Sequence, residues 1–188
     1  PRSTLFPYTT LFRSANARKY FFLPVCCRAF NRRRSDKGFA CEMIEIVFVC
    51  HGNICRSPMA EFIFRDLCEK NGTLGKFRIS SRATSTEEIG NGVHYGTKRI
   101  LNRLGISCDG KYAQRVTKEE MLSADYIIVM DKYNLRNLNI LAEHYGEMHK
   151  KAVQNKTFTL LSFTNRGGEV ADPWYTGDFE QTYIDVKE

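Results

Sequence analysis

The chain has 188 residues, of which 43% are hydrophobic, enough to build the core of one domain. Its formal net charge of +7 would ordinarily suggest an acidic partner. The charge is unevenly placed, however, because residues 1–42 carry nine basic and two acidic side chains, whereas residues 43–188 carry 19 of each. This neutral remainder gives no electrostatic reason to expect nucleic-acid binding.

Residues 1–42 lack the patterns of a folded domain. The stretch from Thr4 to Ser14 looks like the translation of a sequencing adapter, and the rest shows neither helical nor strand periodicity. We therefore expect a non-native or disordered tail, with Met43 as the true start of a domain over residues 43–188. An Arg-rich organellar transit peptide is the alternative. The tail's apolar run is shorter than the roughly 18 residues of a membrane span, so we expect no membrane association.

Cysteine usage indicates a reducing environment. Three of the seven cysteines lie in the tail, and the other four have no zinc-ligand spacing: Cys50, Cys55, Cys68 and Cys108. The four histidines form no i, i+4 pair on a helix. We expect a cytoplasmic protein without a metal or cofactor.

Short β-branched or aromatic runs alternate with helical patterns after residue 43. Strands are predicted over residues 44–49, 77–81, 126–130 and 157–161. Helices are predicted from the N-cap Ser57 to Asn71, over 93–104, from the capping box 117–120, after the N-cap Asp131, and along Phe179, Tyr183 and Val186. This order predicts an α/β fold: a single three-layer domain with a four-stranded parallel sheet and helices on both faces. Because the last helix reaches Glu188 without a cap, we expect the chain to be cut short within it.

Cys50 follows the first predicted strand directly and opens the sequence C-H-G-N-I-C-R-S. A strand, a tight Gly-containing turn and a helix start aim backbone N–H groups and the positive end of the helix dipole at one point, which binds phosphate. The same field favours a Cys50 thiolate. Arg56, six residues on, offers a planar fork for two phosphoryl oxygens. The loop therefore predicts a nucleophilic cysteine that attacks a phosphate ester.

A second motif, D-P-W-Y, begins at Asp172. Pro173 restricts Asp172 to extended conformations, and a carboxyl group in such a loop can protonate a leaving oxygen as a general acid. Trp174 and Tyr175 follow, and two large aromatic side chains there could flank a phenyl ring. The alternative is that Trp174 packs on the core.

The segment 49–61 resembles the phosphate-binding loop of the low-molecular-weight protein tyrosine phosphatases. The resemblance extends over nearly all of residues 43–188, including I-S-S at 79–81, V-T-K-E at 116–119 and D-P-W-Y-T-G-D-F-E at 172–180. It implies a Rossmann-like fold and hydrolysis of phosphotyrosine in protein substrates through a phosphocysteine. The catalytic residues it implies are Cys50, Arg56 and Asp172.

Further roles are implied by the same resemblance. The phosphate-binding residues would be His51, Gly52, Asn53, Ile54, Cys55, Arg56 and Ser57. The substrate pocket would contain His51, Ile54, Trp174 and Tyr175, and the loop would be supported by Asn53, Ser57 and Ser81. Cys55 would trap oxidised Cys50 as a reversible disulfide, and the Ser57 hydroxyl would stabilise the Cys50 thiolate. We expect a monomer or a weak dimer.

The sequence departs from the family pattern at two places. Arg82 stands where a small residue is usual, and Gln114 and Arg115 occur in the reverse of the usual order. We expect neither departure to touch the catalytic set.

Four alternative functions use the same fold or loop. Protein-arginine phosphatases typically carry Thr at the position of Ile54. Thiol-dependent arsenate reductases need further downstream cysteines, where this chain has only Cys108. A phosphocysteine carrier or a phosphotyrosine-binding module would have no use for Asp172. These comparisons favour phosphotyrosine hydrolysis.

Overall fold

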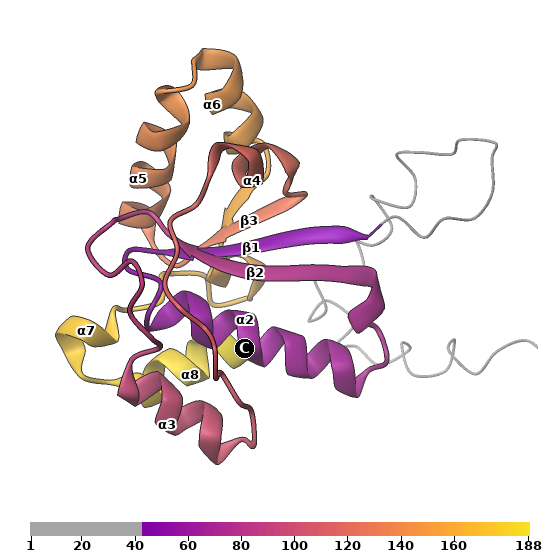
Figure 1. The fold of residues 1–188 in the computed structure, drawn as a ribbon, viewed down its shortest axis with the longest axis vertical. Coiled ribbons are helices and arrows are strands. Elements are labelled where there is room, and N and C mark those ends of the chain that lie inside the picture. The colour runs from indigo at the N-terminus through magenta and orange to yellow at the C-terminus, as the bar shows by residue number, and fades with distance from the viewer. Residues whose placement is uncertain (1–42) are drawn as a thin grey trace, which may run out of the picture. The chain divides into compact units, whose positions relative to one another are not determined.

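The structure is a computed structural model that describes residues 43–188, so the predictions for residues 1–42 lie outside the described residues. Four strands form one sheet in the order β2-β1-β3-β4, and every neighbouring pair is parallel (Figure 1). The strands are β1 (Ile44–Cys50), β2 (Phe77–Ala83), β3 (Tyr126–Val129) and β4 (Thr157–Thr159). β1 is almost wholly buried, as its apolar sequence requires of a strand covered on both faces.

Helices cover both faces of this sheet, which confirms the predicted three-layer architecture (Figure 1). One face carries α4 (Lys118–Ser123), α5 (Lys132–Glu143) and α6 (Glu147–Gln154). The other face carries α2 (Arg56–Lys70), α3 (Tyr95–Arg103) and α8 (Phe179–Lys187), and α8 is preceded by the short helix α7 (Pro173–Thr176). Two 3-10 turns complete the described elements: η3 (Leu74–Lys76) and η4 (Leu160–Phe163). No helix in residues 43–188 is long and apolar enough to cross a membrane.

Successive side chains of β1 point to opposite faces of the sheet, and both faces are apolar. Val47 and Val49 join a buried cluster with side chains of α4, α5 and α6. Phe48 points to the opposite face, where its ring meets Phe64 of α2 edge-on, with ring centroids 5.9 Å apart. A strand with apolar residues on both sides thus holds the two helical layers together.

The start of α2 differs from its prediction. The helix begins at Arg56 with Cys55 in the N-cap position, so Ser57 is not an N-cap. Glu61 does not lie in the first turn either; its side chain is buried. The prediction was wrong because the phosphate loop leads the chain into the helix two residues earlier, without a side-chain cap. The hydroxyl of Ser57 is thereby released for contacts inside the loop.

Other boundaries also shift. β2 runs two residues further than predicted, to Ala83, and β4 is shorter because η4 takes over at Leu160. The capping box at Thr117 and Glu120 is present as predicted. Helix α6 was not predicted, because it follows Gly146, lacks a side-chain cap and has a largely polar sequence.

The strand order indicates where a ligand would bind, at the carboxyl ends of β1 and β3. The chain leaves β1 toward β2 on one side and returns to β3 on the other, so a topological switch point lies between β1 and β3. Open parallel sheets bind ligands outside the carboxyl ends of strands at such a point. Cys50 is the last residue of β1, and Asp131 comes two residues after β3.

Candidate active site

The phosphate loop joins β1 to α2 and buries its nucleophile. Cys50 is 3% exposed, and its Sγ lies 3.0 Å from Oγ of Ser57. The backbone N–H of Asn53 also donates to this sulfur, at 3.3 Å. Asn53 adopts a left-handed conformation with φ of 59°, which Asn tolerates better than most residues and which turns the loop back on Cys50.

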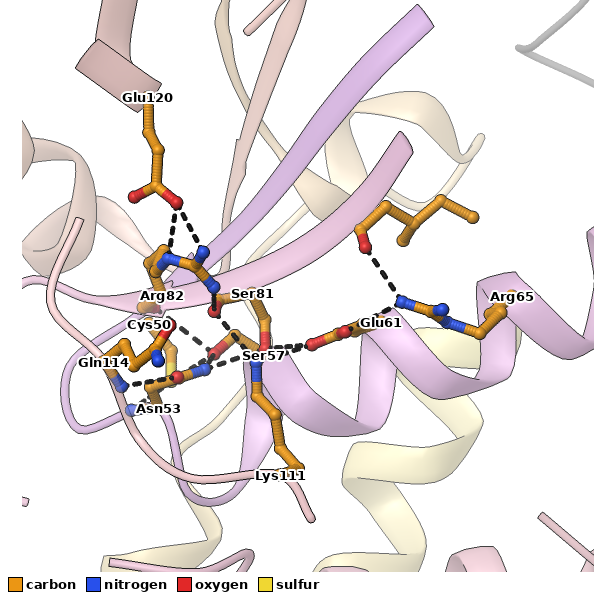
Figure 2. Close-up of polar contacts among 11 residues, drawn as sticks. Cys50, Asn53, Ser57, Glu61, Arg65, Ser81, Arg82, Lys111, Gln114 and Glu120 are labelled. Atoms are coloured by element: carbon orange, nitrogen blue, oxygen red, sulfur yellow. Dashed lines mark hydrogen bonds and ion pairs between the residues drawn. The ribbon is translucent and has the colours of Figure 1, made fainter. Parts of the chain in front are cut away.

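The side chain of Asn53 holds the loop from behind, as Figure 2 shows. Its Nδ2 donates to Oγ of Ser57 at 2.9 Å and to Oγ of Ser81 at 2.8 Å. Its Oδ1 accepts from the backbone N–H of Gln114 at 3.1 Å. The structure therefore brings together the three residues predicted to support the loop and adds Gln114, which the sequence did not single out for this purpose.

Arg56 extends its guanidinium, also buried, under the pocket. It donates to the carboxylates of Asp131 and Asp172 and, at 3.1 Å, to the carbonyl oxygen of Val170. Burial by itself lowers the pKa of this guanidinium, but the negative charge of Cys50 and the two carboxylates outweighs it and raises the pKa. The fork is therefore charged and fixed in place.

Asp131 has a second function beyond its predicted capping role. Its Oδ1 accepts from the backbone N–H of Asn134 at 2.6 Å and caps α5, while its Oδ2 binds Arg56. Sequence reasoning missed the second contact. The available signal was its position just after a buried strand, since parallel strands end at one edge of a sheet.

Asp172 is the N-cap of α7, where a loop was predicted. Its Oδ1 accepts from the backbone N–H of Trp174 at 3.1 Å, and its other oxygen contacts Arg56. Trp174 and Tyr175 are 57% and 84% exposed, so the alternative in which Trp174 packs on the core is wrong. Both rings line the same pocket as Cys50.

This pocket has a volume of about 110 Å³. Of the loop residues predicted to bind phosphate it includes His51, Gly52, Ile54, Cys55 and Arg56, whereas Asn53 and Ser57 turn inward behind it. All three predicted catalytic residues line it: Cys50, Arg56 and Asp172.

Two acidic residues at the pocket, Glu87 and Glu88, were not predicted. Glu87 pairs with Nε2 of His51 at 2.9 Å. A Cβ atom on Gly52 would lie 2.9 Å from Cγ of Glu88, so the loop approaches this segment too closely for a larger residue. Both residues lie in the segment A-T-S-T-E-E-I-G at 83–90, which is part of the family resemblance but was not assigned to the site. The fold brings this segment to the loop.

Cys55 lies in the loop but is chemically distinct from Cys50. Burial, followed by the negative charge of Cys50, raises the pKa of Cys55 to about 12. Its thiol therefore stays protonated near neutral pH and does not compete as a nucleophile. No group of three or more His, Cys, Asp or Glu side chains that could hold a metal ion occurs within residues 43–188.

A buried cysteine, a paired arginine and an aspartate around one small pocket at the switch point define a cysteine-dependent phosphatase. Residues 45–188 match the family described as low molecular weight phosphotyrosine protein phosphatase. The chain is 44% identical over 141 residues to the low molecular weight protein-tyrosine-phosphatase YfkJ of Bacillus subtilis, which covers 74% of this chain and 86% of that protein. It is 35% identical over 142 residues to PtpA of Staphylococcus aureus, which covers 75% and 85%.

Solved structures agree. The crystal structure of YfkJ from Bacillus subtilis aligns with a TM-score of 0.71 and 41% identity, over 78% of this chain and 89% of that one. The phosphatase SP-PTP of Streptococcus pyogenes aligns with a TM-score of 0.66 and 39% identity, over 77% and 87%. The chain belongs to the low molecular weight phosphotyrosine protein phosphatase family, which confirms the resemblance and the hydrolase class predicted from the sequence.

Proposed function

We propose that the chain hydrolyses phosphotyrosine in protein substrates through a phosphocysteine formed on Cys50. The observation that carries the proposal is that Cys50, Arg56 and Asp172 line one pocket. Sγ of Cys50 attacks phosphorus while the bond from phosphorus to the tyrosine oxygen breaks. The Arg56 fork and the loop N–H groups bind the phosphoryl oxygens, where they stabilise the charge of the transition state.

Asp172 supplies the proton that the leaving tyrosine oxygen requires. Its carboxyl group is oriented by the N–H of Trp174 and by contact with Arg56. In the second step the Asp172 carboxylate takes a proton from the water that attacks the phosphocysteine. Phosphate leaves, the Cys50 thiolate returns and Asp172 is protonated again.

The Cys50 thiolate is the nucleophile in the first step and the leaving group in the second, so its stabilisation contributes to both steps. Oγ of Ser57 lies 3.0 Å from Sγ, and the N–H of Asn53 lies 3.3 Å from it. The first contact comes from the start of α2 and the second from the loop, and both residues are shielded from water by burial. Hydrogen bonds to an anion in such a site are stronger than those between neutral groups.

The pocket walls support an aryl substrate. Ile54 adds an apolar side chain, and the exposed rings of Trp174 and Tyr175 can contact the two faces of a phenyl group. Ile54, where an arginine phosphatase typically carries Thr, disfavours that activity, and an arsenate reductase would need further cysteines downstream besides Cys108. The wall and the acid also disfavour a carrier or a binding module.

We also propose that residues 43–188 form the catalytic domain and that it works in a reducing compartment such as the cytoplasm. Three thiols of this domain are free in the structure: Cys50, Cys55 and Cys108.

The test is turnover of a phosphotyrosine peptide. We expect Cys50→Ser to abolish it and Asp172→Ala to lower kcat by roughly 10²- to 10⁴-fold. Asp178→Ala is the matched control, because Asp178 is a helix N-cap in the same segment that does not line the pocket. An unchanged kcat in Asp172→Ala would contradict the mechanism, and faster turnover of a phosphoarginine peptide would favour the arginine phosphatase.

A further inference from the structure

A segment outside the loop contacts its support. Residues 111–117, here called the support segment, run beside the end of β2, where the N–H of Ala83 donates to the carbonyl of Gln114 at 2.7 Å and the N–H of Val116 donates to the carbonyl of Ala83 at 3.0 Å. From this position Gln114 reaches Asn53 of the phosphate loop. Both departures from the family pattern fall at this junction, since Figure 2 shows Arg82 and Gln114 there and Arg115 forms a β-bridge with Ala83.

Lys111 fastens the first end of the support segment. Its Nζ lies 2.8 Å from Oε2 of the buried Glu61 and donates to the carbonyl oxygen of Ser81 at 3.0 Å. Glu61 also pairs with Arg65 at 3.1 Å, but the Arg65 side chain is much more exposed than that of Lys111. Lys111 is therefore the less screened partner of this carboxylate.

Arg82 fastens the second end. Its Nε donates to Oε1 of Glu120 at 2.7 Å, and its Nη1 donates to the carbonyl oxygen of Ser81 at 2.8 Å. The other oxygen of Glu120 accepts from the N–H of Thr117, the last residue of the support segment. The Lys111 ammonium and the Arg82 guanidinium thus both donate to the carbonyl oxygen of Ser81.

Gln114 and Glu61 together determine which groups donate and which accept in the hydrogen bonds among Asn53, Ser57 and Ser81. The N–H of Gln114 selects Oδ1 of Asn53, so Nδ2 faces the hydroxyls of Ser57 and Ser81. The Glu61 carboxylate accepts the proton of the Ser81 hydroxyl at 2.6 Å. Oγ of Ser81 can therefore only accept from Asn53.

The orientation of the Asn53 amide determines where the Ser57 hydroxyl donates its proton. Because Asn53 donates to Ser57, the proton of the Ser57 hydroxyl is left for another acceptor. Two acceptors are in reach, Sγ of Cys50 at 3.0 Å and the carbonyl oxygen of Arg82 at 3.5 Å. The nearer one is also the anionic one, so Ser57 donates to the thiolate.

We propose that Arg82 and Lys111 are positioning residues for Cys50. They hold Ser81 and the support segment so that the Ser81 hydroxyl donates to Glu61 and accepts from Asn53. This fixes the Asn53 amide as a donor to Ser57, and the Ser57 hydroxyl is left to donate to the thiolate. Removing Lys111 leaves Glu61 with the screened Arg65 alone and loosens its hold on the Ser81 hydroxyl. Removing Arg82 takes away the ion pair that fixes Glu120 against Thr117, so the second end of the support segment keeps its backbone bonds to Ala83 but is held less firmly. The importance of this arrangement for turnover rests on the proposed function.

The experiment compares Arg82→Met and Lys111→Met with Arg78→Met, an exposed residue on the same strand as Arg82. One readout is kcat and KM for p-nitrophenyl phosphate. The other is the rate of Cys50 carboxymethylation by iodoacetate across pH, followed by mass spectrometry, which requires no turnover. We expect each positioning variant to lose about tenfold in kcat with little change in KM, the rate effect of one weakened hydrogen bond to a charge. The alkylation profile should move to higher pH, and Lys111→Arg should restore both readouts.

Unchanged kcat and alkylation in both methionine variants, or an equal loss in Arg78→Met, would overturn the proposal. If a methionine variant does not fold, Glu120→Gln carries the test. Gln at this position retains the capping box but loses the ion pair with Arg82, so a wild-type alkylation profile in Glu120→Gln would also overturn it. A wild-type protein without phosphatase activity would refute the proposed function instead, and the alkylation profiles would still decide this inference.

Discussion

Replacing Gly96 by Ala tests how α8 is docked beside the active site. Gly96 is the second residue of α3, and a Cβ atom there would lie 2.6 Å from three carbons of the Phe179 ring. That ring is buried and stacks on His94, with centroids 4.9 Å apart and planes 4° apart, so it cannot yield without moving a second ring. Ala favours a helix over Gly by about 1 kcal/mol, whereas overpacking costs typically 1–3 kcal/mol. Because the ring is confined, we expect the upper part of that cost and a net destabilisation of about 1–2 kcal/mol.

Urea unfolding of Gly96→Ala measures this loss as a lower midpoint at an unchanged slope. Gly75→Ala is the control, because a Cβ there meets nothing within 4 Å and we expect its stability within about 0.5 kcal/mol of wild type. The His94 ring also forms a T-shaped pair with Trp174 of the pocket, with centroids 5.8 Å apart, so kcat should fall as well. A Gly96→Ala variant as stable as wild type would refute the packing argument, whereas Phe179→Leu in the Gly96→Ala background should recover part of the loss.

Two further predictions concern redox behaviour and the N-terminal residues. Because burial keeps the Cys55 thiol protonated, mild peroxide should oxidise Cys50 first, and Cys55 should then trap it as a disulfide. Activity should return with a thiol reductant in wild type but not in Cys55→Ser, and equal recovery in both would contradict this. Deleting residues 1–42 should leave kcat and KM for an aryl phosphate unchanged, and a loss of more than about twofold would show that these residues contribute to the site.

The sequence predicts the fold where apolar strands and helix caps are strong local signals. β1 and β3 stand out because nearly every residue in them is apolar, and the α4 start stands out because Thr117 and Glu120 cap it reciprocally. Helix α6 has neither signal, since Gly146 opens it and most of its residues are exposed. The start of α2 was misplaced for a related reason, because the loop and not a capping side chain determines it.

The same distinction applies to the site. Cys50, Arg56 and Asp172 could be predicted because the chemistry of each depends on neighbours in sequence, namely a strand end, a helix start and a proline. The contact of Asp131 with Arg56 depends on two strands ending side by side, which a pattern within one segment cannot show. Glu87 reaches His51 across 36 positions of sequence by the same kind of long-range approach.

The ion pair with Glu120 explains why the fold tolerates Arg82 at a position where the family usually has a small residue. A lone Arg82 beside the buried Ser81 would cost several kcal/mol if its charge were unpaired. It is tolerated because Glu120, already needed to cap α4, has a free oxygen that faces it. The capping box, the support segment and the phosphate loop are therefore linked through one carboxylate. A substitution at Glu120 that removes both side-chain oxygens should lower the stability of α4 and change the reactivity of Cys50 together, although Glu120 does not line the pocket.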